Sequence, residues 1–272
     1  MGLISKLLCI LSLLINYNVI NASQKIGADI LLVINYNHAH YNSIPFLKEL
    51  YSPYFPNIVF VGPKLHPEVE FCDHDRGYYG YKSIAQIMIK YPHYQGYLWV
   101  HDDCVINPWN FQRFDQSKIW FNNPGIAQLD PAGLTKWVWW RKAIGYQAIK
   151  NVYDKLSQKH KDALRANCGE NRVFWGYSDI VYIPTKYASD IIGLCALLNR
   201  EHSFLEIALP TLCGCLDNKK NWEMLSGLAL WNRENPKVMY SQKLDYLHPM
   251  KFSNQDYQNF IREQFKQYKE SV

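Results

Sequence analysis

Three short runs of apolar residues, separated by segments of helical periodicity, constrain the fold of this 272-residue chain most strongly. The runs are residues 29–35 (DILLVIN), 57–61 (NIVFV) and 96–100 (GYLWV). Apolar residues at successive positions are typical of strands that are buried on both faces of a parallel sheet. Segments 41–51 and 83–90 lie between the runs, and their apolar residues recur at the spacing of one helix face. This alternation predicts an α/β fold with a Rossmann-like, mainly parallel sheet flanked by helices.

The second half of the chain alternates less regularly. Helices are expected at residues 143–156, 159–166, 187–199 and 255–269, and short strands at 118–121, 126–129 and 180–183. No stretch rich in Gly, Pro or Ser separates the two halves. A single domain over residues 24–272 is therefore predicted.

The net charge is small, because 29 Lys and Arg against 24 Asp and Glu leave +5. The basic residues form no clustered stripe of the kind that binds nucleic acid, so that class of partner is not expected. A mild positive charge does suit an anionic small ligand. With 48% hydrophobic and 15% aromatic residues, the composition excludes a disordered chain.

The first 23 residues are typical of a secretory signal peptide. Lys6 precedes the apolar run 7–15, and the small pair Ala22 and Ser23 follows a polar break. Because a membrane-spanning helix needs about 20 apolar residues, cleavage is favoured over an uncleaved anchor. Contact with a membrane is expected only for the anchor. The protein is expected in the secretory pathway, either in the lumen of the ER or Golgi or secreted.

Loss of Cys9 with this leader would leave six cysteines in a compartment that permits disulfides. They are Cys72, Cys104, Cys168, Cys195, Cys213 and Cys215. Disulfides are expected, but six cysteines allow fifteen connectivities, so none is assigned. Cys213 and Cys215 are expected to pair with distant partners rather than with each other.

Two adjacent carboxylates, Asp102 and Asp103, follow the third apolar run and His101. In open α/β sheets, ligands bind beyond the carboxyl ends of the strands. Neighbouring carboxylates repel each other unless a cation or a proton intervenes. Oxygen ligands suit Mg²⁺ or Mn²⁺, and a nearby imidazole shifts the preference toward Mn²⁺. The pair therefore indicates a metal site, although Asp also caps turns that precede a Pro, here Pro108.

The segment His101-Asp102-Asp103 resembles the Asp-x-Asp region of GT-A fold glycosyltransferases, with His101 in place of the first Asp. The blocks at residues 31–62, 99–103 and 174–184 resemble a set of nucleotide-sugar transferases. That set includes the plant STELLO proteins and the xylosyltransferase-like enzymes of large algal viruses. The likeness covers most of residues 28–252 and implies a GT-A type fold.

This resemblance implies roles for the residues around the motif. Asp103 would ligate Mn²⁺ or Mg²⁺ together with the diphosphate of the donor, and His248 would complete the metal shell. His101 or Asp102 would reach the ribose of the donor or the water shell of the metal. Lys251 would serve the phosphates as a point charge.

The polar residues after the first predicted strand lie where this fold places the nucleotide base. They are Asn35, Asn37, His38 and His40. A different class of enzyme remains open, because two histidines one residue apart are ligands in some metal hydrolases. In a zinc-dependent hydrolase or deacetylase, His38 and His40 would bind Zn²⁺ together with Asp102 and His248.

The segment 174–179 (FWGYSD) resembles the aromatic, Gly-rich turn on the acceptor side of GT-A clefts. Trp175 and Tyr177 are the candidates for acceptor binding, because flat rings with a polar edge cover sugar faces. Asp179 is expected to bond a hydroxyl of the acceptor. The alternative is a buried Asp that backbone donors satisfy.

Glu206 lies within an apolar stretch, FLEIALP. Burial would raise the pKa of its carboxyl toward the working pH, which a general base needs. Glu206 and then Asp179 are the candidate catalytic bases. An ion pair of Glu206 with Arg200 or Lys186 is the competing interpretation.

Together these features predict a metal-dependent glycosyltransferase, either a hexosyl- or a pentosyltransferase. It would move a sugar from a nucleotide diphosphate donor to a hydroxyl of a glycan or glycoprotein, with the metal acting as a Lewis acid on the leaving diphosphate. The zinc hydrolase and a non-catalytic lumenal partner of the same fold remain alternatives.

Overall fold

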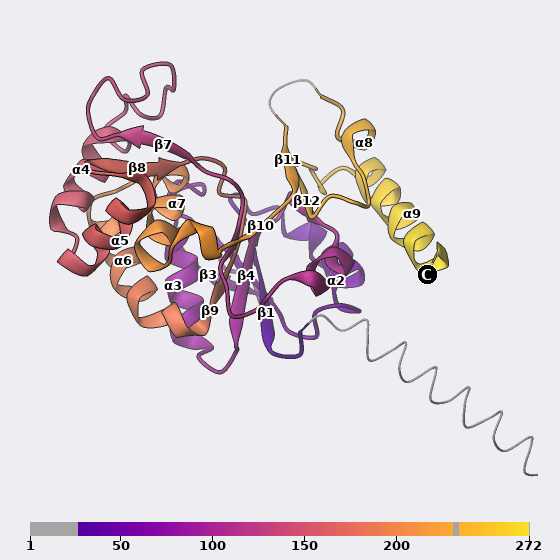
Figure 1. The fold of residues 1–272 in the computed structure, drawn as a ribbon. Coiled ribbons are helices and arrows are strands. Elements are labelled where there is room, and N and C mark those ends of the chain that lie inside the picture. Colours follow the sequence, from indigo (N-terminus) through magenta and orange to yellow (C-terminus); the bar gives the residue numbers. More distant parts are fainter. Residues whose placement is uncertain (1–26, 231–233, 272) are drawn as a thin grey trace, which may run out of the picture.

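A central sheet organises the computed structural model, which describes residues 27–230 and 234–271 (Figure 1). Seven strands within the described residues form it in the order β10-β6-β9-β4-β1-β2-β3. They are β1 (Ile30–Asn35), β2 (Ile58–Gly62), β3 (Val69–Phe71), β4 (Gly96–His101), β6 (Trp120–Phe121), β9 (Ile180–Pro184) and β10 (Glu223–Met224). Strand β1 pairs in parallel with β2 and β4, whereas β9 runs antiparallel between β4 and β6.

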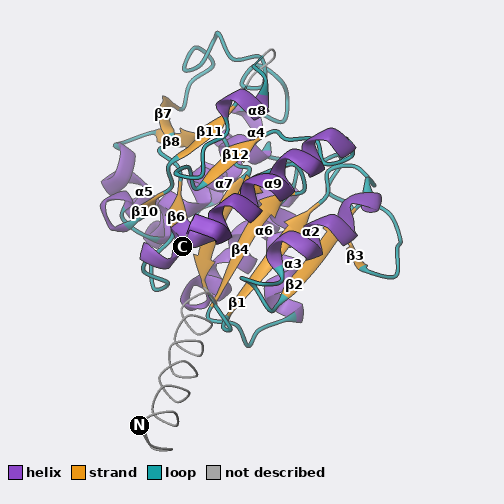
Figure 2. Cartoon of the chain, turned by 90° about the vertical axis from the view of Figure 1, so that its right-hand side faces the viewer, coloured by secondary structure: helices purple, strands orange, loops and turns teal. Residues whose placement is uncertain are grey.

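Helices cover both faces of this sheet (Figures 1 and 2). The helices of the described residues are α2 (Ile44–Tyr51), α3 (Tyr81–Lys90), α4 (Tyr146–Lys155), α5 (Gln158–Cys168), α6 (Ala188–Arg200), α7 (Leu205–Leu216), α8 (Pro236–Met239) and α9 (Gln255–Ser271), of which the short α8 lies near β11, away from the central sheet. Short 3₁₀ turns occupy Tyr41–Ser43, Pro108–Arg113, Thr185–Tyr187 and Lys219–Asn221.

The apolar residues of each central strand divide between two cores. In β1, Leu31 and Val33 pack with residues of α3, α4, α6 and α7. Ile30, Leu32 and Ile34 point to the other face and pack with residues of α2 and α9. Successive side chains of a strand point to opposite faces, so a strand between two helix layers must be apolar throughout. This explains the uninterrupted apolar run in the sequence.

Two smaller sheets lie beside the central one. Strands β11 (Gly227–Ala229), β12 (Tyr246–His248) and β5 (Val105–Ile106) form the first, in which β12 runs antiparallel to β5. Strands β7 (Gly125–Gln128) and β8 (Arg172–Trp175) form an antiparallel pair. Because β5 begins two residues after Asp103, its pairing brings the late strand β12 next to the end of β4.

The predicted fold class, a single α/β domain with a mainly parallel sheet between helices, is confirmed. The three apolar runs form β1, β2 and β4. The helix expected from residue 143 begins at Tyr146, because residues 143–145 form a turn in which the Gly145 N–H donates to the Lys142 carbonyl. Sequence analysis left α7, β3, β8 and the strands of the first smaller sheet unassigned.

The expectation of disulfides is wrong for the six described cysteines, which are all free and buried. Cys213 and Cys215 share helix α7, and the other four lie on separate parts of the chain. All six fill core positions as small apolar side chains, as free Cys commonly does. Cys168 also donates from Sγ to the carbonyls of Leu164 at 3.1 Å and Arg172 at 3.3 Å.

The expected signal peptide, residues 1–23, lies outside the described residues. In the part of the chain that the structure describes, no helix combines the length and the apolar character needed to cross a bilayer.

A glycine at the start of β4 tests the packing of the central strands. A Cβ added to Gly96 would lie 2.1 Å from Tyr182 Oη. Tyr182 is fully buried and stacks on Trp120, with ring centroids 4.0 Å apart. Since overpacking of a core costs about 1–3 kcal/mol, Gly96→Ala should lower the free energy of unfolding by that amount in urea denaturation. Gly193→Ala is the matched control, because no heavy atom lies within 4 Å of its added Cβ. Equal stability of the two variants would contradict this packing.

Candidate active site

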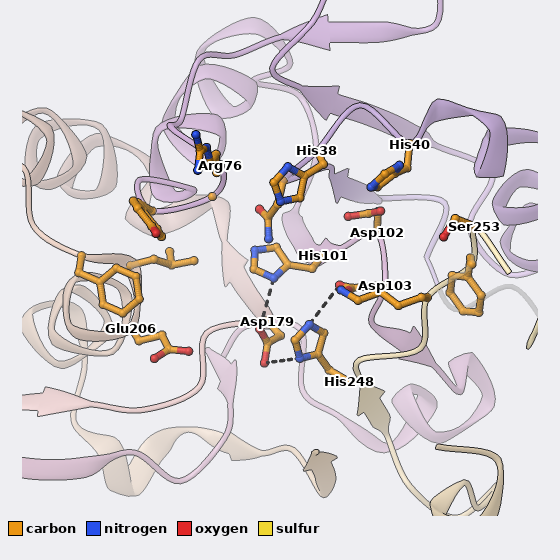
Figure 3. Close-up of a pocket in the computed structure, with 17 residues that line it drawn as sticks. His38, His40, Arg76, His101, Asp102, Asp103, Asp179, Glu206, His248 and Ser253 are labelled. Carbon is orange, nitrogen blue, oxygen red and sulfur yellow. Dashed lines mark hydrogen bonds and ion pairs between the residues drawn. The ribbon is translucent and has the colours of Figure 1, made fainter. Parts of the chain in front are cut away.

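A cavity of about 470 Å³ opens beyond the carboxyl ends of β1 and β4 (Figure 3). Polar residues from distant parts of the chain line it: Asn37, His38, His40, Arg76, His101, Asp102, Asp103, Asp179, Glu206, His248, Lys251 and Ser253. Most of these residues are predicted site residues, and the fold brings them to one place.

Backbone pairing fixes the acidic segment at the end of β4. The His101 N–H donates to the Asp179 carbonyl at 2.9 Å, and the Asp102 N–H donates to the Asn35 carbonyl at 3.0 Å. The chain then turns, since the Cys104 N–H donates to the His101 carbonyl at 3.0 Å. The segment is therefore held from both neighbouring strands.

A chain of ion pairs runs through the cavity floor (Figure 3). Asp179 lies between two imidazoles, with Oδ1 3.2 Å from His101 Nδ1 and Oδ2 3.2 Å from His248 Nδ1. His248 Nε2 in turn lies 3.1 Å from Asp103 Oδ1, and Lys251 pairs with the other oxygen of Asp103. The buried carboxylate of Asp179 is therefore paired with two imidazoles. The alternative, in which backbone N–H groups satisfy this carboxylate, is not what the structure shows.

Burial and neighbouring charges shift the pKa values of Asp103, Asp179 and His248 in opposite directions. Burial alone would raise the pKa values of Asp103 and Asp179, but His248 and the neighbouring cationic groups outweigh it and hold both well below the usual range. Burial would also lower the pKa of His248, yet Asp179 and Asp103 raise it to about 10. At neutral pH, a protonated His248 therefore bridges two carboxylates.

The pKa values of Asp102 and Glu206 shift in the opposite direction, because burial is the dominant effect on both carboxyls. Burial and the charge of Asp103 raise the pKa of Asp102 to about 8. Burial and the charge of Asp179 raise the pKa of Glu206 to about 8. Glu206 projects from the first turn of α7, on the opposite side of the cavity from His40 and Ser253 (Figure 3).

The competing interpretation of Glu206 as an ion-paired core residue is wrong. Within the described residues, neither Arg200 nor Lys186 pairs with it, and Arg200 lies against Glu201 instead. Glu206 is left as a carboxyl with a pKa near the neutral range inside the cavity.

The residues at the cavity floor fit a metal ion. Ligand atoms of His101, Asp103 and His248 all lie within 4.8 Å of one another. The buried Nε2 of His101 has no hydrogen-bond partner within the described residues. Two imidazoles and one carboxylate suit Mn²⁺ or another transition metal better than Mg²⁺. The hydrolase set is not assembled in residues 27–230 and 234–271, where His38 and His40 join no such cluster.

Arg76 reaches the cavity from a strained loop and was missed by the sequence analysis. Asp75, Arg76 and Gly77 have φ values of 46°, 54° and 89°. A Cβ on Gly77 would lie 2.1 Å from Asn37 Oδ1, and the Gly77 N–H donates to buried His74 at 3.0 Å. Such strain concentrates at functional sites. The pair Arg-Gly in the polar stretch DHDRGYYGY was the available signal.

Three predicted site residues lie outside the cavity lining. Asn35 is fully buried, and its Nδ2 lies 3.3 Å from Asn37 Oδ1, so it positions Asn37. Trp175 and Tyr177 line a second cavity of about 440 Å³ instead of the first.

No family model matches the chain. "Probable glycosyltransferase STELLO1" of Arabidopsis thaliana is 25% identical over 225 residues, which are 78% of this chain and 28% of the relative. "Probable glycosyltransferase STELLO2" of the same plant is 22% identical over 223 residues, 79% of this chain and 29% of the relative. The chain resembles the STELLO glycosyltransferases. This confirms the resemblance seen in the sequence, and the chain spans less than a third of the length of these relatives.

Two solved structures are also similar in part. A glycosyltransferase involved in the glycosylation of the major capsid of PBCV-1 matches with a TM-score of 0.31 and 13% identity, over 62% of this chain and 66% of that chain. The WbbM bifunctional glycosyltransferase matches with a TM-score of 0.40 and 10% identity, over 80% of this chain and 45% of that chain.

His248 offers a test of the ion-pair chain in protein kept metal-free with a chelator. Folding raises its pKa from 6.5 to about 10. Its stabilising contribution is therefore fully present below pH 6.5 and is lost as the pH rises through about 10. His248→Gln should lower the free energy of unfolding by about 3 kcal/mol at pH 6. The difference from the wild type should shrink toward pH 10, as measured by urea denaturation at each pH. A difference that grows with pH would overturn the assignment.

Proposed function

We propose that the chain is a metal-dependent glycosyltransferase that moves a sugar from a nucleotide diphosphate donor to a hydroxyl of a glycan or glycoprotein. The observation that carries the proposal is the His101, Asp103 and His248 cluster at the end of β4. The similarity to the STELLO proteins supports the same reaction class. The composition of residues 1–23 supports a place in the secretory pathway.

The cavity carries the charges that a diphosphate needs. His101, Asp103 and His248 would hold the metal, which when bound supplies a Lewis acid for the departing diphosphate. Lys251 pairs with Asp103 at the same floor, and Arg76 lines the cavity without an ion pair to any described residue. Both cations are free to contact phosphate oxygens once a divalent ion neutralises Asp103. Asn37, His38 and His40 line the adjoining wall, where the base of the donor would lie.

Glu206 is the candidate for the proton transfer. A hydroxyl that attacks the sugar must lose its proton, and a carboxylate inside the cavity accepts it. The pKa of about 8 makes Glu206 a stronger base than an exposed carboxylate while leaving an ionised fraction at neutral pH. Asp179 is less suited, because its ion pairs with His101 and His248 keep its pKa low and occupy both oxygens.

Removal of the metal-binding carboxylate tests the donor site. Asp103→Asn should abolish Mn²⁺-dependent binding of UDP and GDP in calorimetric titration, because it removes the anionic ligand of the cluster. Asp162→Asn, on the exposed face of α5, is the control and should bind as the wild type does. Unchanged Mn²⁺-dependent binding by Asp103→Asn would remove the metal assignment. Tight Zn²⁺ binding by the wild type without any affinity for nucleotide would favour the hydrolase.

The pH dependence of turnover tests the base. Since Glu206 must be ionised to accept a proton, kcat/KM should rise with pH and level off above about 8. Glu206→Gln should lower kcat by about 10²–10⁴ and remove this rise, while nucleotide binding is retained. Glu170→Gln, which is exposed, should behave as the wild type. A Glu206→Gln enzyme that keeps the wild-type pH profile would exclude this residue as the base.

A further inference from the structure

The second cavity adjoins the first through two shared chain segments. Trp175 and Tyr177 line the second cavity, and Asp179 lines the first. On strand β12, Tyr246 lines the second cavity and His248 the first. Residues two apart on an extended strand lie about 7 Å apart. On β12, the linings of the two cavities therefore come within about 7 Å of each other.

Tyr177 lies near enough to the candidate base for the charge of Glu206 to act on its hydroxyl. Burial raises the pKa of its hydroxyl to about 12, and the charges of Glu206 and Asp179 add to the shift. Buried Asn122 holds the segment in place, because its Nδ2 donates to the Tyr177 carbonyl at 2.7 Å. The Gly176 N–H donates to the Glu206 carbonyl at 2.8 Å, which ties the same segment to α7.

The lining of the second cavity combines rings with uncharged polar groups. The rings belong to Trp175, Tyr177 and Tyr246, and exposed Asn123 and Ser226 contribute an amide and a hydroxyl. Of the described residues that line it, none is Asp, Glu, Lys, Arg or His. Aromatic faces cover the C–H surfaces of a sugar, and amide and hydroxyl groups bond its hydroxyls. A phosphate or carboxylate would find no cation there.

Gly125 fixes the position of the Trp175 ring. The two residues are cross-strand partners in the β7–β8 pair. A Cβ on Gly125 would lie 2.7 Å from Trp175 Nε1 and 2.9 Å from Cε2. The indole therefore lies against the bare backbone of Gly125, and Trp137 contacts it with ring centroids 5.3 Å apart. The absence of a side chain at position 125 is what allows this ring position.

We propose that the second cavity is the acceptor subsite and that it takes an uncharged sugar residue, which places a hydroxyl toward Glu206. The proposal rests on the proposed function and adds the class of acceptor to it. It assigns Asn123, Gly125, Ser226 and Tyr246 to the site, next to Trp175 and Tyr177.

Binding of simple glycosides tests this subsite in the full chain. The probes are 4-nitrophenyl glycosides of xylose, glucose, galactose and mannose, with the glucuronide as the charged counterpart. Saturation-transfer NMR should detect at least one neutral glycoside on the wild type and a much weaker signal from the glucuronide. Gly125→Ala should weaken binding of the neutral glycoside at least tenfold, because the added methyl group would displace the Trp175 indole. Asn123→Ala, which changes an exposed side chain, should weaken binding of the neutral glycoside severalfold without affecting folding.

The controls separate this inference from the proposed function. Gly193→Ala introduces the same methyl group where it meets no neighbour within 4 Å, and it should bind the glycoside as the wild type does. Mn²⁺-dependent UDP or GDP binding should be unchanged in Gly125→Ala. If the wild type binds no neutral glycoside, if it prefers the glucuronide, or if Gly125→Ala binds normally, the subsite is overturned. Failure of the proposed function shows separately, as a wild type without metal-dependent nucleotide binding.

Discussion

The bridge that His248 forms between Asp103 and Asp179 is the interaction on which the site depends. Two carboxylates less than a tenth exposed repel each other and lose hydration, so their burial requires a compensating cation. The His248 imidazole supplies that charge from strand β12, which follows both carboxylates in the sequence. Its position requires the β5–β12 pairing, and the Met250 N–H extends that pairing to the Asp103 carbonyl at 2.7 Å. The smaller sheet thus fixes the position of His248 relative to the acidic segment.

Because of the same bridge, binding of the proposed metal would release a proton. A ligating imidazole must be neutral, whereas the two carboxylates keep His248 protonated up to a pKa of about 10. If His248 and Asp103 held a divalent ion, the imidazole would have to give up this proton, and the ion would supply the charge that neutralises Asp103. Lys251, which is paired with Asp103 in its absence, would then be released toward a bound anion. Under the proposed function, the affinity for metal and the affinity for a diphosphate would therefore be coupled through the Asp103 carboxylate.

Local patterns predicted the central fold because a strand between two helix layers has a composition of its own. The runs around Leu32 and Leu98 are apolar on both sides, and α3 and α9 carry regular apolar faces. The acidic segment was also readable, since its place after a buried strand follows from chain order. The partner positions were not. That His248 meets Asp103 was expected only from the resemblance to GT-A glycosyltransferases and not from a local pattern. No local pattern predicts that left-handed backbone turns Arg76 into the cavity, or that Trp175 lies across from Gly125. Each depends on long-range pairing or on one backbone conformation.

The prediction of disulfides was wrong because the number of cysteines gives no information on where their side chains lie in the fold. Cys195, Cys213 and Cys215 are enclosed within the core between the helices. Their stability contribution is that of ordinary apolar packing, so the strength of this core does not vary with the redox potential around it. Alkylating reagents reach such sulfurs only while the helix layer is detached from the sheet. The rate at which these cysteines are labelled would consequently measure how often the domain opens.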